Sequence, residues 1–449
     1  MPENSRAAVV RLLTRLRRDK GYSNILLDDL LSKGDVEPKD QAFVSRLFYG
    51  VLERQMTLDY ILERCCSLPL RKCHPVVLDI LRVGCYQLLF MDQVPPSAAV
   101  NEAVRCAKTM KQAHASGFVN AVLRRVARQG QHLLDVLPEG EYGDEVRYSC
   151  PRELIRMWTA AYGPEQAKGL LVSLNETPDT VLRVNTLCTS PDAFASRLEK
   201  HSINYQTCHG LPACFRLKCS SLHKKLESEA TNCYYYQDIA SQWACLALGA
   251  KPGERVADVC AGPGGKSFTV AQYMENQGLL YAGDVHAFKC ETMERRAQDL
   301  GIRILRTGVR DARNPCPEEW RQSFDRVMCD VPCSGLGVIR RRPEIRYKPL
   351  ASLDSLPEIQ YAILKRSAEM VRPGGVLQYS TCTLRKEENE QVVNRFLAEN
   401  PQFAPRILPL PVCFHAAGLP PHWYITLFPH IHQTDGFFIA GFVRNGVDA

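Results

Sequence analysis

Residues 256–267 read Val256-Ala-Asp-Val-Cys-Ala-Gly-Pro-Gly-Gly-Lys-Ser267, and this stretch decides the fold. A short apolar run ends in a turn of small residues, and a helical pattern follows the turn. Small residues let backbone N–H groups approach a ligand closely, and a helix N-terminus favours negative charge. The stretch therefore predicts a strand, a candidate ligand-binding turn and a helix.

The same succession of an apolar run, a turn and a helical pattern repeats along the C-terminal part of the chain. Short apolar runs at 256–260, 279–284, 324–330 and 376–380 alternate with helical patterns. This alternation predicts an α/β domain with a parallel sheet covered by helices on both faces. In such sheets ligands bind beyond the carboxyl ends of the strands, so the polar residues at these ends are the candidates for a site.

Three acidic residues occupy such strand ends. Asp284 closes the second strand, where a carboxylate commonly accepts hydrogen bonds from ribose hydroxyls. Asp311 follows the expected third strand, and Asp330 closes the fourth. Each acid alone could equally be a helix N-cap. Together with the glycine turn, the three acids favour a nucleoside pocket.

A phosphate-binding loop is one alternative for the glycine turn. The pattern G-x-x-x-x-G-K-[ST] would need glycine at position 260, where this chain has Cys260, and the dinucleotide pattern G-x-G-x-x-G is absent as well. A nucleotidase using Gly265-Lys266-Ser267 nevertheless stays open as an alternative, as does a plain structural turn.

Two cysteines follow strand ends on the same side of the predicted sheet. Cys333 stands in Asp330-Val-Pro-Cys-Ser-Gly335, and Cys382 stands in Ser380-Thr-Cys-Thr383. A free thiol has a pKa of about 8.5, which helix N-termini and cationic neighbours lower. A buried filler is the alternative for each cysteine alone, but the pair favours reactive thiols. The basic segment 338–348 lies between them and suits a passing nucleic-acid strand, with a solvated loop as the alternative.

Composition limits the classes of protein that the chain can be. Its 449 residues predict about three domains, and its 45% apolar and 23% charged residues are ordinary for a folded protein. No run of 18 apolar residues occurs, so we exclude membrane spanning and secretion. The 19 cysteines are scattered without C-x-x-C spacing, which indicates reduced thiols, a cytoplasmic location and no metal.

The first third of the chain carries the excess positive charge. Residues 1–130 contain 20 Lys and Arg against 13 Asp and Glu, so their surplus equals the net charge of +7 of the whole chain. Apolar residues recur there at helical spacing, which predicts an all-α domain over 1–132. Clustered Arg and Lys favour a polyanion partner, although a solvated helix face is the alternative. We expect a small α+β linker domain over 133–232 and the α/β domain over 233–449.

The chain resembles the RNA cytosine-5 methyltransferases of the Sun/Fmu type. Its N-terminal segment resembles a NusB-like RNA-binding domain, a combination similar to that of the bacterial members acting on small-subunit ribosomal RNA. The departures are Gly262 in place of the usual second Ala, and Val331 in place of Ala or Pro. The resemblance is carried in order by Arg183-Val-Asn-Thr-Leu187, Gln237-Asp-Ile-Ala-Ser-Gln242, Asp258-Val-Cys-Ala-Gly-Pro-Gly-Gly-Lys266, Asp330-Val-Pro-Cys-Ser-Gly335, Ser380-Thr-Cys-Thr383 with Glu387-Glu-Asn-Glu390, and Thr434-Asp-Gly-Phe-Phe438.

This resemblance implies a Rossmann-like class I methyltransferase domain that uses S-adenosylmethionine. It implies that Asp284 binds the ribose, Asp311 lies near the adenine, and Asp330 lies near the methyl donor and the target base. It also implies that Cys382 adds to C6 of cytosine and that Cys333 helps to release the product. The loop under the cofactor would comprise Cys260, Ala261, Gly262, Pro263, Gly264, Gly265 and Lys266.

The expected activity is methylation of C5 of a cytosine in 16S ribosomal RNA, by a monomer that involves neither DNA nor a membrane. Two alternatives from other classes stay open: a P-loop-like nucleotidase and a non-catalytic RNA-binding assembly factor. Within the favoured class, the roles of Cys333 and Cys382 could be exchanged, because enzymes acting on DNA cytosine use a Pro-Cys thiol.

Overall fold

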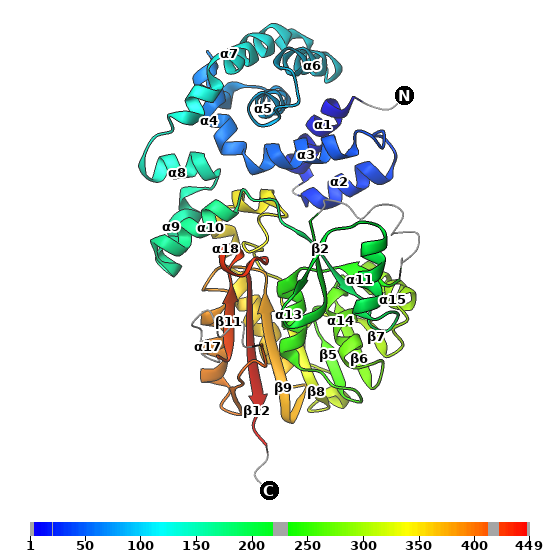
Figure 1. Ribbon diagram of the computed structural model, residues 1–449. Helices are drawn as coiled ribbons and strands as arrows, with labels where there is room; N and C mark the ends of the chain where they lie inside the picture. Colours follow the sequence, from blue (N-terminus) through cyan, green and yellow to red (C-terminus); the bar gives the residue numbers. More distant parts are fainter. Residues whose placement is uncertain (1–3, 20, 219–231, 412–421, 447–449) are drawn as a thin grey trace. The chain divides into compact units, whose positions relative to one another are not determined.

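The computed structural model describes residues 4–19, 21–218, 232–411 and 422–446 (Figure 1). Backbone contacts divide the chain into two compact units. Unit 1 comprises residues 1–176 and 339–350, and unit 2 comprises residues 177–338 and 351–449. Within the described ranges, no helix is both long and apolar enough to cross a lipid bilayer.

Unit 1 is helical, which confirms the prediction of an all-α N-terminal domain. Its core is built from the apolar faces of its helices, and Phe48, Leu58 and Leu123 within it are fully buried. Pro75 and Pro96 each begin a helix, where the missing N–H has no intrahelical partner. The helices are α1 Ser5–Asp19, α2 Ser23–Ser32, α3 Gln41–Glu53, α4 Gln55–Cys65, α5 Pro75–Phe90, α6 Pro96–Thr109, α7 Ser116–Asp135, α8 Gly140–Tyr148, α9 Arg152–Tyr162 and α10 Pro164–Ser173.

The segment Ile339–Leu350 completes unit 1, although it is far from the unit's other residues in the sequence. Arg346 is buried, and its guanidinium donates to the carbonyls of Glu53, Tyr148, Ser149 and Leu174 at 3.2–3.3 Å. These carbonyls belong to the ends of α3, α8 and α10, whose last turns lack intrahelical partners. For Arg346 the prediction of RNA contact is therefore wrong, because this side chain closes three helix ends.

A carboxylate fixes the same segment to α2. Glu344 accepts hydrogen bonds from the backbone N–H of Ser23 at 3.0 Å and from its hydroxyl at 2.7 Å. Ser23 begins α2, where the helix dipole favours a negative charge. The segment is thus held at both a helix N-terminus and three helix C-termini.

We expect Arg346→Met to lower the free energy of unfolding of unit 1 by about 3 kcal/mol, because four carbonyls at helix ends lose their buried donor. The loss can be measured as a shift of the thermal midpoint and as faster proteolysis within residues 4–176. Arg71→Met at an exposed position is the matched control and should leave both unchanged. Equal stability of the two variants would contradict the capping role.

Unit 2 begins with a small antiparallel sheet in the strand order β2-β3-β1-β4. The first strand of this sheet along the chain, β1, ends at Val184. Phe194 and Phe215 pack edge-to-face under the sheet, with their ring centroids 5.7 Å apart. The elements are β1 Thr180–Val184, α11 Pro191–Lys200, β2 Tyr205–Cys208, β3 Leu211–Leu217 and β4 Tyr234–Tyr236.

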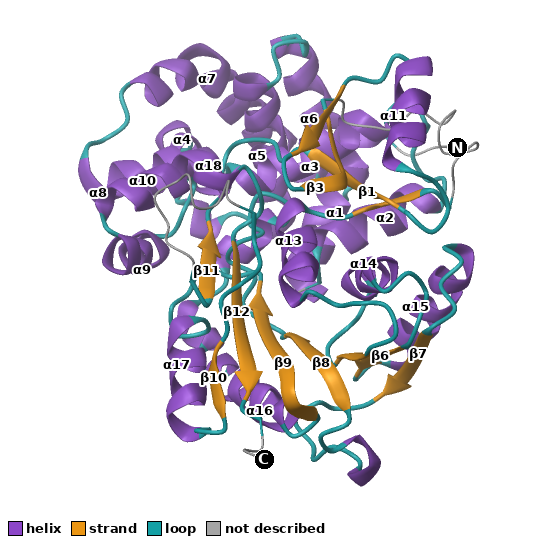
Figure 2. Ribbon diagram, turned by 60° about the horizontal axis from the view of Figure 1, so that its bottom comes forward, coloured by secondary structure: helices purple, strands orange, loops and turns teal. Residues whose placement is uncertain are grey.

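The larger sheet of unit 2 has the order β10-β12-β9-β8-β5-β6-β7, with β11 paired to β12 (Figure 2). Strands β5 to β9 are parallel, whereas β12 runs antiparallel to β9, β10 and β11. The strands are β5 Arg255–Asp258, β6 Leu279–Asp284, β7 Leu305–Val309, β8 Phe324–Asp330, β9 Val371–Thr381, β10 Phe403–Pro405, β11 Tyr424–Leu427 and β12 Phe437–Arg444.

Both faces of this sheet are apolar and covered by helices, which confirms the prediction for its parallel part. Neighbouring residues Val256 and Ala257 enter different clusters, because side chains alternate along a strand. The cluster with Val256 includes residues of α13, α14 and α15, and the cluster with Ala257 includes residues of α16 and α17. The helices are α13 Ile239–Leu248, α14 Gly265–Tyr273, α15 Ala287–Asp299, α16 Leu356–Ala368, α17 Glu390–Glu399 and the short α18 Pro429–His432.

Candidate functional site

The glycine-rich turn joins β5 to α14 at the carboxyl end of the parallel strands. The Ala261 N–H donates to the carbonyl of Gly283 at 2.8 Å, which ties the turn to β6. A Cβ atom on Gly262 would lie 2.3 Å from Oδ2 of Asp284. Gly264 has a φ of 105°, a conformation that favours glycine. These glycines bring the backbone close to the second strand end.

Asp284 lies at the end of β6 against this turn. Its buried carboxylate accepts hydrogen bonds from the N–H of Gly262 at 3.2 Å and of His286 at 3.0 Å, and Lys289 Nζ lies 3.2 Å away. A carboxylate beside a close-approaching glycine backbone is the donor and acceptor set that a nucleoside needs at a strand end. The residues present therefore fit a nucleoside cofactor.

Lys266 and Asp330 form a half-buried ion pair at the centre of the site. Lys266 Nζ lies 2.7 Å from Oδ2 of Asp330, and the hydroxyl of Ser380 donates to Oδ1 at 2.9 Å. Burial works to lower the pKa of Lys266, but the Asp330 carboxylate outweighs it, and the pKa is raised. The Phe437 ring lies under the ammonium, with its centroid 5.2 Å from Nζ. Lys266 therefore stays charged, and Asp330 is held between two donors.

Asp258 is a buried acid of the site that was not among the predicted site residues. It closes β5, and Ser267 Oγ donates to its Oδ2 at 2.7 Å. Burial raises the pKa of Asp258 to about 7. Its place at a strand end, like those of Asp284 and Asp330, was the signal that could have identified it.

The two predicted thiols lie side by side. The sulfur atoms of Cys333 and Cys382 are 3.2 Å apart, and both residues are half-buried. The hydrogen bond to Cys382 and then burial raise the pKa of Cys333 well above its ordinary value. Cys333 therefore keeps its proton and can donate it toward the sulfur of Cys382.

Residues after Cys382 hold both thiol loops. The buried Glu388 accepts hydrogen bonds from the N–H of Ser334 and from Gln360 Nε2, each at 2.9 Å. The Asn389 side chain donates to the carbonyl of Thr383 at 2.9 Å. This explains structurally why Glu-Asn follows the second cysteine, a role that the sequence pattern did not disclose.

Asp311 and Cys260 were also predicted for the site, and their contacts differ from those of the other predicted residues. Asp311 pairs with Arg313 through both carboxylate oxygens, and this hydrogen bonding lowers the pKa of Asp311. Cys260 is half-buried against the apolar cluster of α16 and α17, and burial raises the pKa of its thiol well above the ordinary value. Cys260 therefore contributes its backbone and its volume to the turn.

Side chains from the start of unit 2 support the glycine-rich turn. Gln237 Nε2 donates to the carbonyl of Gly265 at 3.0 Å, and its Oε1 accepts from Thr269 at 2.7 Å. Arg183 is buried and donates to Oε1 of Gln272 on α14 at 3.1 Å. The small sheet thereby fixes the helix that follows the turn.

Family models match three successive parts of the chain. Residues 3–128 match the NusB family, and residues 150–221 match the ferredoxin-like domain described as Methyltr_RsmF/B-like. Residues 245–443 match the model described as 16S rRNA methyltransferase RsmB/F.

Curated relatives are similar over almost the whole length. The probable ribosomal RNA small subunit methyltransferase B of Synechocystis is 33% identical, over 97% of this chain and 98% of the relative. The protein of the same description from Bacillus subtilis is 32% identical, over 98% and 99%.

Solved structures share the fold. The structure of PH0851 has a TM-score of 0.81 at 24% identity and covers 98% of this chain and 99% of that chain. A methyltransferase homologue from Pyrococcus horikoshii has a TM-score of 0.58 at 27% identity, over 69% and 100%. NSun6 from Pyrococcus horikoshii, solved with SFG, has a TM-score of 0.57 at 21% identity, over 66% and 98%.

Proposed function

The chain belongs to the 16S rRNA methyltransferase RsmB/F family, and from this we propose that it methylates C5 of a cytosine in 16S ribosomal RNA through a covalent bond from Cys382 to C6. Family membership confirms the resemblance seen in the motifs. The chain is an S-adenosylmethionine-dependent rRNA methyltransferase, so the nucleotidase and the non-catalytic assembly factor are set aside.

The turn of residues 260–266 and the strand-end acids would hold the cofactor. We propose that Asp284 accepts hydrogen bonds from the ribose hydroxyls, that Asp311 lies near the adenine, and that Asp330 faces the methyl donor and the target base. S-adenosylmethionine supplies an electrophilic methyl group on a sulfonium sulfur. The close backbone approach at Gly262 supports the assignment of Asp284.

Cys382 acts as the nucleophile in this proposal. Cytosine C5 is a poor nucleophile, but addition of the Cys382 thiolate to C6 makes C5 enamine-like and reactive toward an electrophilic methyl group. The raised pKa of Cys333 supports this order of roles, since the thiol that keeps its proton is the poorer nucleophile. Asp330 would accept a hydrogen bond from the exocyclic amine as electrons shift through the ring.

Cys333 acts afterwards. Addition to C6 consumes the charge on the Cys382 sulfur, so Cys333 no longer faces an anionic sulfur and can release its proton to solvent. Its thiolate then takes the proton from C5, and the electrons of that bond restore the double bond and expel Cys382. One methyl group enters the ring and one proton leaves, which balances the reaction.

The 3.2 Å contact between the two sulfurs beside Asp330 is the observation that supports this function most strongly. The test is incubation of the purified full chain with deproteinised 16S rRNA and labelled S-adenosylmethionine, followed by mapping of the modified base. We expect 5-methylcytosine at one position. Methylation of another base, or of another atom of cytosine, would overturn the proposal.

We expect Asp284→Ala to raise the Kd for S-adenosylmethionine roughly 10- to 100-fold, because a charge-assisted hydrogen bond to the cofactor is lost. Isothermal titration calorimetry measures this value directly. Asp299→Ala, an exposed position at the end of α15, is the matched control and should bind the cofactor like the unmodified chain. Unchanged affinity of Asp284→Ala would remove Asp284 from the cofactor site.

The remaining expectations are carried forward as proposals. We infer three functional domains over 1–132, 133–232 and 233–449, and ribosomal RNA rather than DNA as the substrate. A monomer is expected, which sedimentation at micromolar concentration checks.

A further inference from the structure

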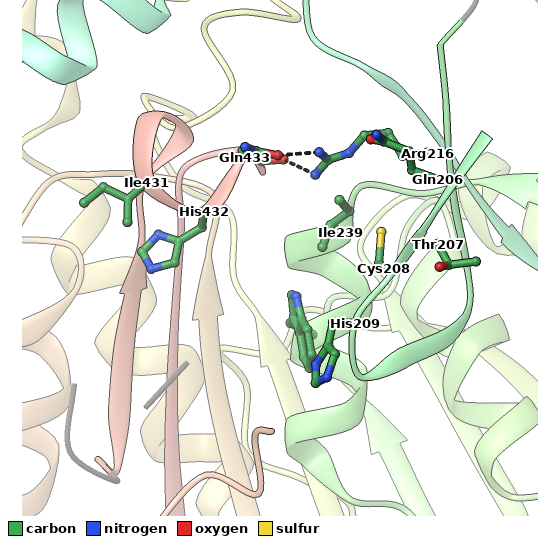
Figure 3. Close-up of a pocket in the computed structure, with 10 residues that line it drawn as sticks. Gln206, Thr207, Cys208, His209, Arg216, Ile239, Ile431, His432 and Gln433 are labelled. Atoms are coloured by element: carbon green, nitrogen blue, oxygen red, sulfur yellow. Dashed lines mark hydrogen bonds between the residues drawn. The ribbon is translucent and has the colours of Figure 1, made fainter. Parts of the chain in front are cut away.

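A hollow of about 350 Å³ lies in unit 2, apart from the glycine-rich turn (Figure 3). Strands β2 and β3 form one side, and α18 with the residue after it forms the other. The Arg216 guanidinium reaches across to Gln433, donating to its side-chain oxygen at 2.5 Å and to its carbonyl at 3.0 Å. We name this hollow the Arg216 pocket; its characteristic lining residues are Gln206, His209, Arg216, Trp243, His432 and Gln433.

The Arg216 pocket is connected to the reacting thiols by a short series of backbone contacts. Gln433 lies three residues before Gly436, whose N–H donates to the carbonyl of Gly337 at 2.8 Å. The N–H of Gly337 in turn donates to the carbonyl of Cys382 at 2.9 Å. Trp243 at the pocket belongs to the same apolar cluster as Phe437, and Cys382 packs against that cluster. The pocket is therefore a neighbour of the catalytic centre.

The lining combines a flat apolar base with polar side chains at the rim. Trp243 is buried, and Gly210 lets the β2–β3 turn close over it, because a Cβ there would lie 2.9 Å from the indole. His209 is exposed at this turn and presents an imidazole ring to the hollow. Arg216 is oriented by Asp179, whose carboxylate lies 3.2 Å from its Nε. Rings, a guanidinium and glutamine amides are the groups that hold single-stranded RNA bases.

We propose that the Arg216 pocket binds the base of a nucleotide that flanks the target cytosine in the RNA strand. This inference rests on the proposed function, because it assigns the pocket to the same substrate. A base that enters a catalytic site must leave its stack, so its neighbours lose a stacking partner as well. A hollow of this volume, linked to the Cys382 loop through Gly436 and Gly337, receives one such neighbour, which stacks on a ring and bonds to the Arg216 and glutamine groups. Holding it keeps the cytosine in register with the thiols.

The test uses the full chain and an rRNA fragment that contains the mapped cytosine. Each flanking nucleotide is replaced in turn by an abasic residue, which removes the base and keeps the phosphate. We expect kcat/KM to fall at least about fivefold at one flanking position. His209→Ala should lower kcat/KM on the intact fragment by a similar factor. The kcat/KM of this variant should fall little further on the abasic fragment, since the substitution and the missing base remove the same contact.

Gln277→Ala is the matched control, because Gln277 is exposed at the opposite ends of the strands and should leave kcat/KM unchanged. Affinity for S-adenosylmethionine should be equal in all variants. Equal kcat/KM on every abasic fragment, or losses that multiply when His209→Ala meets the abasic residue, would overturn the assignment of the pocket while leaving the proposed function intact. Failure of the unmodified chain to form 5-methylcytosine at all would overturn both.

Discussion

Cys382→Ala is expected to abolish methyl transfer, with a loss of roughly 10⁴-fold or more, and to form no covalent complex with RNA. Without the sulfur that adds to C6, C5 of the cytosine stays unreactive, whatever the cofactor does. Activity is measured with labelled S-adenosylmethionine, and covalency by electrophoresis under denaturing conditions. Cofactor affinity should stay within about twofold, since the thiol is assigned to the base and not to the cofactor.

Cys333→Ala is expected to give the opposite covalent behaviour. Addition and methyl transfer proceed, but removal of the C5 proton slows by roughly 10²- to 10⁴-fold because its base is missing. The protein should therefore accumulate as a complex with methylated RNA that survives denaturation. If Cys382→Ala trapped RNA and Cys333→Ala did not, the two roles would be exchanged. The buried Cys316→Ala serves as a control for loss of a thiol elsewhere in unit 2.

The second large effect is expected from Asp330→Asn, which should lower kcat by roughly 10²- to 10³-fold. The substitution removes the charge 2.7 Å from Lys266 and the acceptor assigned to the cytosine amine. It also removes what raises the pKa of Lys266, so burial would then dominate and lower that pKa. Lys266 would then lose its charge as the pH rises, so the activity of the variant should fall with rising pH in a range where the unmodified chain is flat.

Asp325→Asn separates this effect from a general disturbance of β8. Asp325 lies at the other end of the same strand and pairs with Arg372. It should retain full activity. A kcat for Asp330→Asn within threefold of the unmodified chain would show that Asp330 does not meet the transition state.

Local patterns were enough to predict much of the fold. The runs at 279–284 and 324–330 are strands with those bounds, because apolar runs between turn residues encode buried parallel strands. The antiparallel strand β12 was not predicted, although Phe437–Arg444 is strongly apolar. Its pairing with β9 joins residues about 60 positions apart, and no short pattern encodes such a contact.

For the site, the positions of residues at strand ends were the useful signal. The sequence did not show which of these residues contact one another. The sequence singled out Cys333 and Cys382 individually, while their contact depends on two loops that Glu388 holds from a third segment. The Arg-rich segment 338–348 led to a prediction that is wrong for one residue. Charge predicted RNA contact for Arg346, but burial against helix ends is a property of tertiary packing.

The position of Ile339–Leu350 also limits how this protein can be divided. Six residues after Cys333 the chain enters the helical unit, supplies Arg346 and Glu344 to it, and returns by residue 351. A truncation at residue 177 would therefore leave the basic segment Ile339–Leu350 without the carbonyls and the serine that it binds, and would leave the isolated N-terminal fragment with three frayed helix ends. A chimera that exchanges the helical unit must therefore exchange residues 1–176 and residues 339–350 together.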